Sequence, residues 1–583
     1  MLSLGLAACA YWPGGRAPRA VGPAYTLFDD FLPDGIVTIL YVRDVPGTKE
    51  EFRRTELSAR LTGQTSRGLW RRVDFLRPWV EVAFRQISDQ VDEIAWGTYR
   101  AEGREEWFLI ARLNQPARRV LERLHERTLP RVAEDVRPLE LESTRYRGRR
   151  MYEWVKREGG AIRRLVTYVL AGQVIVMGSD AAFVRQAIER RPAWPARWFA
   201  GRSSGESGSV RNASLGVAMA DFERSDDLYL WSRMETNVAT AGDTLRSRLG
   251  QVARRIESVF ASNLSAVSAG FQLTPPTITG RWRLEWTSAT GEKKASKAAF
   301  DFGAIVPASA QTFAAVQGLP FDHPLFAELR AMVIRAMTSG PFERLRGSMG
   351  ILRLIPGVGD LPRMIASLEG RAAYCSFRPS ATSGTERCVM IALDDPAVVA
   401  SGLRAAGLLA RRAAEFEDYR GRPILCVGER KVGAEGGVVF SVIGGALVVA
   451  GRVEVARVLV DAIEAGERLD RQPMVAQLQR YRRSAGLLAE FYSSPAPSSA
   501  AGDSPPPPKR AAFSILEDRR VIELAAGRSY SLCLQRPRGV EIVTSSATGF
   551  HWSSATVGLA AIALRSPLVA GLLRFDVGEG TQE

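Results

Sequence analysis

The sequence predicts an α+β protein made of two diverged copies of a β-β-α-β-β-β-α module, with antiparallel sheets backed by helices. Three recurrences predict this fold class. Tyr-Arg-Gly-Arg at 146–149 returns at 419–422, and a strand-glycine-strand pattern at 169–178 returns at 442–451. A strand that ends in Leu-polar-polar-Pro at 113–116 returns at 393–396. Because the landmarks keep their order in the two halves, they indicate an internal duplication.

Each module begins with a predicted antiparallel pair of strands. In the first half the pair covers 94–100 and 107–113, because apolar and polar residues partly alternate on the two sides of a polar, glycine-containing turn. A helix is expected from Pro116, since proline is tolerated in the first helical turn. Strands at 149–155, 163–170 and 173–178 follow, and Ser179-Asp180 caps a helix over 181–189.

Glycines at matching places predict the turns of the repeat. Glycine adopts the positive φ angles of two-residue hairpins at little cost, so Ala171-Gly172 and Gly444-Gly445 are expected to be equivalent tight turns. The structural turn residues of the two copies are Gly148, Gly172, Gly178, Gly421, Gly445 and Gly451.

Composition suggests the domain organisation. We expect a signal segment and tether at 1–22, the first half at 23–290 and the second half at 291–583. A strand at 37–42 opens the first half, whereas 324–351 is predicted to be largely helical. A Pro-rich stretch at 493–510, with four consecutive prolines, is predicted to be a disordered loop.

The net charge of +15 comes mainly from arginines scattered in short pairs. A nucleic-acid binder usually concentrates basic residues on one element and adds aromatic side chains for stacking. The sequence therefore favours a solvated, arginine-rich surface and argues against specific nucleic-acid binding.

The N-terminal segment Leu6-Ala7-Ala8-Cys9 resembles the lipobox of bacterial lipoproteins. The resemblance implies lipidation of Cys9 and a membrane-anchored protein of the cell envelope that faces the periplasm. Only eight residues precede Cys9, and none of them is basic. This interpretation therefore requires a start codon upstream of Met1, and the protein would otherwise be cytoplasmic.

Motifs for catalysis, cofactors and metals do not emerge from the sequence. The three histidines lie far apart, and the five cysteines include no C-x-x-C pair. Gly201-Arg202-Ser203-Ser204-Gly205 matches G-x-S-x-G, but its polar flanks do not suit a nucleophile elbow. Adjacent acidic pairs, such as those at 226–227 and 394–395, are expected in turns or caps. We predict no catalytic, cofactor-binding or metal-binding residues.

Cys375 and Cys388 fall on two predicted neighbouring strands. Two buried apolar thiols are the favoured interpretation, because free cysteine is among the most buried residue types. A disulfide in an oxidising compartment remains the alternative if the strand register brings the two Cβ atoms together.

Phe31-Leu32-Pro33-Asp34-Gly35, followed by an apolar strand, resembles the opening of an uncharacterised family of bacterial envelope proteins in which Leu-Pro-Ala-Asp precedes the first strand. The family supplies no activity. We therefore expect a non-catalytic envelope lipoprotein that serves as a structural or protein-interaction platform for an unknown envelope protein. The alternatives are a carrier of an apolar or lipid ligand held between sheet and helices, and an enzyme with a dispersed site.

Overall fold

The computed structural model describes sixteen segments of the chain and leaves the residues between them undescribed. These are residues 31–33, 35–56, 58, 90–114, 139–158, 161–190, 226–233, 264–286, 299–317, 371–378, 384–409, 414–427, 437–482, 486–494, 527–536 and 539–547. No described helix is long and apolar enough to cross a membrane.

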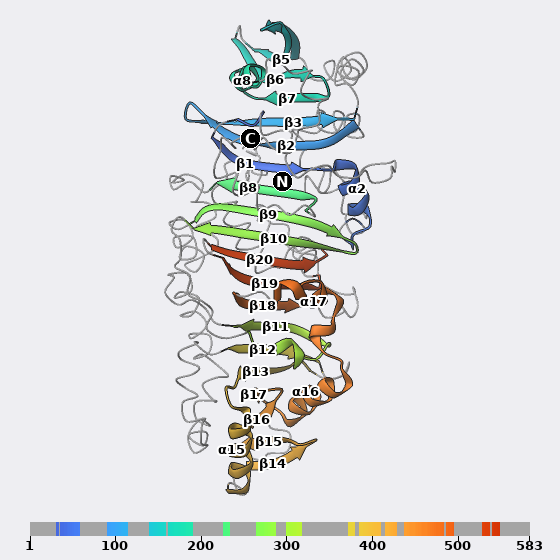
Figure 1. Cartoon of the computed structure of the whole chain (residues 1–583), viewed down its shortest axis with the longest axis vertical. Coiled ribbons are helices and arrows are strands. Elements are labelled where there is room, and N and C mark those ends of the chain that lie inside the picture. The colour runs from blue at the N-terminus through green and yellow to red at the C-terminus, as the bar shows by residue number, and fades with distance from the viewer. Residues whose placement is uncertain are drawn as a thin grey trace, which may run out of the picture.

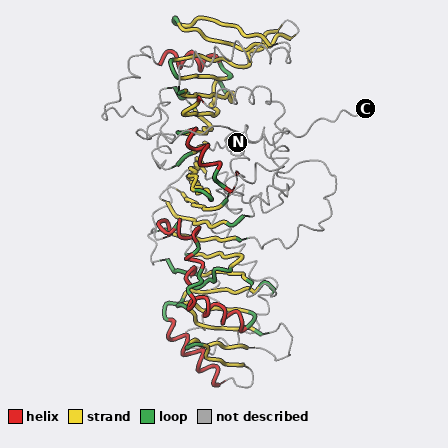
Figure 2. The backbone as a smooth tube through the Cα atoms, turned by 90° about the vertical axis from the view of Figure 1, so that its right-hand side faces the viewer, coloured by secondary structure: helices red, strands yellow, loops and turns green. Residues whose placement is uncertain are grey.

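The described strands form one antiparallel sheet of 20 strands, stacked into a long column (Figures 1 and 2). The first half contributes β1 Ile36–Val42, β2 Val91–Ala101, β3 Arg104–Leu113, β4 Leu139–Tyr146, β5 Arg149–Glu158, β6 Ala161–Ala171, β7 Val174–Gly178, β8 Leu228–Arg233, β9 Leu264–Thr274 and β10 Thr277–Trp286. The second half contributes β11 Ala310–Val316, β12 Ala372–Phe377, β13 Glu386–Ala392, β14 Ala414–Tyr419, β15 Arg422–Val427, β16 Val438–Ile443, β17 Ala446–Ala450, β18 Leu487–Ser493, β19 Ser529–Arg536 and β20 Gly539–Ser546.

The strand order is the same in the two halves. From the outer edge inward, the first half runs β4-β5-β6-β7-β3-β2-β1-β8-β9-β10, and the second runs β14-β15-β16-β17-β13-β12-β11-β18-β19-β20. The halves meet where β10 pairs with β20, and Arg281 lies opposite Val543 at this seam. Strands β4 and β14 therefore occupy the two far ends of the molecule (Figure 1).

The predicted α+β class is wrong, because the strands of the two halves belong to one continuous sheet and not to two helix-backed modules. The described helices are few: α2 Val45–Arg53, α8 Ala181–Arg190, α15 Pro396–Leu409, α16 Val453–Ala465, α17 Pro473–Gln477, α18 Gln479–Arg482, and the short 3-10 turns η3 Phe302–Ala304 and η4 Leu469–Arg471. The predicted module also has too few strands. It places three strands between its two helices, whereas four strands lie between α15 and α16. The predicted helix at 324–351 and the Pro-rich loop beyond residue 494 lie outside the described residues.

The hydrophobic core lies on the two faces of the sheet. Val184 and Ile188 of α8 pack on the first half, and Val455 and Leu459 of α16 pack on the same face of the second half. Leu403 of α15 belongs to a cluster on the opposite face of the second half. Neighbouring strand residues point to opposite faces, so these strands are apolar on the two sides.

The turn glycines occupy different environments. Gly148 and Gly421 each follow an arginine with positive φ, and the two residues together form the tip of a hairpin. The turn between β6 and β7 consists of Gly172 and Gln173, because Ala171 pairs with Val174.

Gly444-Gly445 is the matching turn between β16 and β17. The expected equivalence of Ala171-Gly172 with Gly444-Gly445 is therefore wrong by one residue, because the turn in the first half is Gly172-Gln173. Gly178 ends β7, where a side chain would collide with Phe183, and Gly451 follows β17 with open space around it.

Candidate functional site

The candidate site that lies closest to the seam is a group of charged side chains from β10, β19 and β20. Glu541 is fully buried and pairs with Arg283 of β10, with 3.2 Å between Oε1 and Nε, and with Arg536 of β19. Arg281, only 7% exposed, lies 3.8 Å from Glu541 and donates to Asp226 at 2.7 Å. Burial alone would raise the pKa of Glu541, but Arg283 and Arg536 lower the pKa below its ordinary value. The group ties the two halves of the sheet together.

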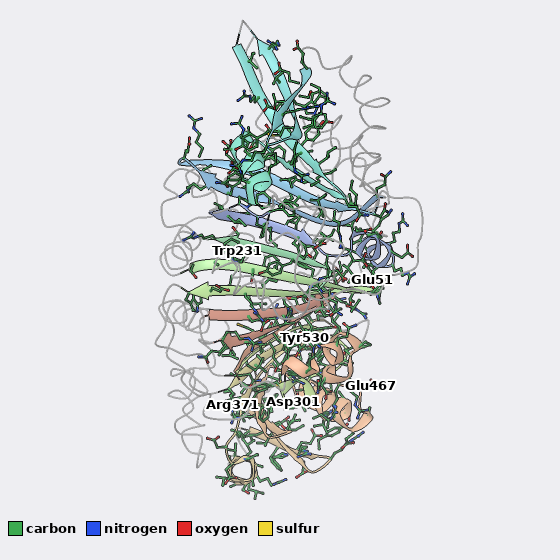
Figure 3. All side chains as sticks on the ribbon, turned by 45° about the horizontal axis from the view of Figure 1, so that its top comes forward. Glu51, Trp231, Asp301, Arg371, Glu467 and Tyr530 are labelled. Atoms are coloured by element: carbon green, nitrogen blue, oxygen red, sulfur yellow. The ribbon has the colours of Figure 1, made fainter. Side chains whose placement is uncertain are left out.

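Asp227 follows Asp226 in the sequence, and its pKa is shifted in the direction opposite to that of Glu541. Its Oδ2 accepts a hydrogen bond from the Leu273 backbone N–H at 2.7 Å. Burial raises the pKa of Asp227 from 3.8 to about 7, the Leu273 N–H opposes the shift, and the nearby Glu51, Asp226 and Asp44 add to it. Glu51 of α2 is labelled in Figure 3. Asp227 is therefore a carboxyl group with a pKa near neutrality.

A second network lies in the second half, where Figure 3 shows Asp301 and Tyr530. Glu490 of β18 is 1% exposed and accepts hydrogen bonds from Arg482 Nε at 3.0 Å and from the Tyr530 hydroxyl at 2.7 Å. Arg482 also donates to Asp301, which caps η3. Burial, followed by the charge of Glu490, raises the pKa of Tyr530 well above its ordinary value, so the hydroxyl stays protonated as a donor. The network fastens α18 and η3 to the sheet.

The first half contains a third buried carboxylate. Glu93 of β2 accepts a hydrogen bond from the Tyr41 hydroxyl at 2.5 Å and pairs with Arg112 at 3.2 Å. Burial raises the pKa of Glu93, while Arg112 and Tyr41 oppose the increase. This carboxylate also connects neighbouring strands, since β2 lies between β1 and β3.

The Tyr-Arg-Gly-Arg motif has one structural role in the two halves. The Tyr146 hydroxyl donates to Glu189 of α8, and the Tyr419 hydroxyl donates to Asp461 of α16 at 3.0 Å. The guanidinium groups of the helix residues Arg185 and Arg457 lie 5.6 Å from the respective ring centroids, a cation–π arrangement. The tyrosine thus docks each outer hairpin on its helix, which explains why this motif recurs.

The sequence-predicted residues fall partly outside the described structure. Cys9, the three histidines and the G-x-S-x-G segment all lie among undescribed residues. Asp395 caps α15 by accepting from the backbone N–H groups of Ala397 and Val398. Cys375 and Cys388 are buried free thiols on β12 and β13.

The buried networks were missed by sequence reasoning, although a signal exists. In each network, at least one charged side chain lies buried inside a strand, as with Glu93, Arg281, Glu490 and Glu541. Such residues are almost never fully buried without a partner. Within the described segments, no group of three or more His, Cys, Asp or Glu side chains is arranged to hold a metal ion. The described carboxylates of the three networks are engaged by guanidinium or hydroxyl groups that join elements of the fold.

No family model and no curated protein matches the chain. Among solved structures, crystal form I of TP0453 matches with 10% identity and a TM-score of 0.25, covering 46% of this chain and 81% of that chain. Crystal form III of TP0453 gives 10% identity, a TM-score of 0.24 and coverages of 47% and 83%. Similarities of this size carry no argument about function.

Proposed function

We propose that this protein is a non-catalytic platform of the cell envelope that binds partner proteins at the ends of its sheet and is anchored to the membrane by a lipid on Cys9. The observation that carries the proposal is the single sheet of 20 strands, in which the seam between β10 and β20 is bonded along its length. Such a sheet holds its two ends at a fixed separation.

Exposed apolar side chains at these ends support partner binding. The exposed large hydrophobic residues among the described ones are Leu141, Ile162, Tyr374, Val398 and Leu408. Leu141 and Ile162 lie on β4 and β6 at one end, and Val398 and Leu408 lie on α15 at the other (Figure 1). Exposed apolar patches rimmed by polar residues commonly mark sites of protein–protein interaction. The ends are therefore the favoured contact surfaces.

The test is photo-crosslinking in cells, with a crosslinking amino acid placed at Ile162, at Leu408 and at a control position, Arg54. Arg54 lies just after α2, away from the two ends, and its side chain is 65% exposed. We expect discrete protein adducts from Ile162 or Leu408 and none from Arg54. Adducts equally abundant at all three positions, or absent from the two ends, would contradict the platform role.

The anchor needs a separate experiment with the native upstream DNA in place. Wild-type protein is expected to incorporate labelled lipid and to fractionate with membranes, and Cys9→Ala is expected to do neither. An unlabelled, soluble wild-type protein would refute the anchor, while the crosslinking result would still decide the platform role.

A further inference from the structure

The hairpin of β12 and β13 places two cysteines face to face. Cys375 is the direct cross-strand partner of Cys388 in the antiparallel register. The exposed fractions of the two residues are 0% and 2%, and they belong to the same core cluster. Directly opposed residues have Cα atoms about 4.5–5.5 Å apart, within the range of about 4.4–6.8 Å that disulfides span.

Packing alone does not require cysteine at these positions. The matching strands of the first half are β2 and β3, and the matching opposed pair there is Gly97 and Phe108. Phe108 fills the core between Tyr99 and Phe183, with ring centroids 6.2 and 5.9 Å away. One half thus combines a large residue with glycine, whereas the other half uses two thiols. The thiol pair is a chemical difference between two otherwise equivalent places.

The other described cysteines are not arranged in this way. Cys426 pairs with Val439 and Glu415 on its neighbouring strands, and Cys533 pairs with Ala489 and Ile542. Only Cys375 and Cys388, among the described cysteines, face each other across a strand pair. This geometry makes them the expected partners in any intramolecular oxidation of the described part of the chain.

We infer that Cys375 and Cys388 are a redox modification site, which a disulfide oxidant converts to a cross-strand disulfide as β12 and β13 pair during folding. With glutathione disulfide as oxidant, the thiolate of one cysteine attacks a sulfur of the oxidant, forms a mixed disulfide and releases one glutathione thiolate. The second cysteine, after losing its proton, displaces the other glutathione. The two protein thiols are oxidised, and one glutathione disulfide is reduced to two glutathione molecules.

The folded protein slows oxidation of the reduced pair. Burial, and then the neighbouring Cys388, raises the pKa of Cys375 well above its ordinary value, so the reactive thiolate is scarce once the sheet has formed. Oxidation is therefore expected while the hairpin forms, and only slowly in the native protein. The inference does not depend on the proposed platform role.

The test uses the purified full chain, unfolded with its thiols reduced and then refolded with either glutathione disulfide or excess reductant. After alkylation under denaturing conditions, peptide mass spectrometry is expected to find Cys375 linked to Cys388 only in the oxidised sample. The linked protein is expected to unfold at a temperature about 2–3 °C higher than the reduced protein, because the crosslink restricts the unfolded chain.

Matched variants decide whether the shift belongs to this pair. Cys375→Ala and Cys388→Ala are expected to remove the thermal shift, whereas Cys426→Ala and Cys533→Ala are expected to retain it. Full alkylation of Cys375 and Cys388 after oxidative refolding would overturn the inference. Crosslinks that mainly join other cysteines, or an oxidised protein that fails to fold, would also overturn it.

Discussion

Glu541→Gln tests whether the charged group at the seam holds the two halves of the sheet together. The substitution keeps the shape of the side chain and removes its charge. Glu541 is fully buried, and it contacts Arg283, 20% exposed, and Arg281, 7% exposed. Arg536 is 41% exposed, so solvent screens its contact and little is assigned to it. Removing one partner of a buried ion pair commonly costs about 3–5 kcal/mol, because the remaining charge stays desolvated.

The expected cost here is smaller, about 2–4 kcal/mol, because Arg281 keeps its ion pair with Asp226. Urea unfolding at pH 7, followed by tryptophan fluorescence, measures the loss as a lower midpoint at unchanged slope. The control is Glu417→Gln, which removes the ion pair of Glu417 with Arg457. The side chain of Glu417 is 35% exposed, and that of Arg457 is 42% exposed. That variant is expected to lose at most about 1 kcal/mol. A Glu541→Gln midpoint no lower than the control would refute the role of the seam group.

Two further predictions concern a glycine and a carboxyl group. Gly97→Ala is expected to destabilise the protein by about 2 kcal/mol or more, because its new Cβ would collide with the Thr38 carbonyl oxygen and, at 2.9 Å, with the Phe108 ring. Gly451→Ala, with open space around it, is expected to leave the urea midpoint nearly unchanged. For Asp227, the raised pKa means that the folded state binds its proton more tightly than the unfolded state, so its contribution to stability falls as pH rises from about 4 to about 7. Asp227→Asn is therefore expected to have a larger free energy of unfolding than wild type at pH 8. Between about pH 4 and about pH 7, its free energy of unfolding should depend less on pH than that of wild type. Equal pH profiles for the two proteins would contradict the reasoning.

Local sequence patterns predicted individual strands correctly where apolar and polar residues alternate along the strand or where glycine ends it. The expected strands at 94–100, 107–113 and 149–155 lie inside β2, β3 and β5, and the helix expected at 181–189 is α8. In these segments, apolar spacing and turn chemistry act within a few residues of each other. These elements can therefore be predicted from the sequence alone.

The outer strands and the seam were not predictable in the same way. Strand β14 reads Ala-Glu-Phe-Glu-Asp-Tyr, because an outermost strand bonds on one side only and tolerates charge. Strand β20 has Glu541 in its middle, and its stability there depends on Arg283 and Arg536 from two other strands. The pairing of β10 with β20 joins segments that are far apart in the sequence, and such pairing leaves no local pattern. The sequence therefore predicted two separate modules where the structure has one sheet.

Charge on the outer strands leads to a prediction about association. In the described part of the chain, no strand pairs with the outer side of β14, so its backbone groups can accept a strand from a second molecule. Glu415 and Asp418 on β14 oppose such contacts because apposed copies would bring like charges together. Replacing both with valine is expected to produce concentration-dependent end-to-end association, measured by sedimentation velocity. The control removes the same charge from exposed positions of α16, with Glu454→Val and Glu464→Val. If the control associates as strongly as the β14 variant, net charge rather than the strand edge governs assembly, and the argument from the edge is wrong.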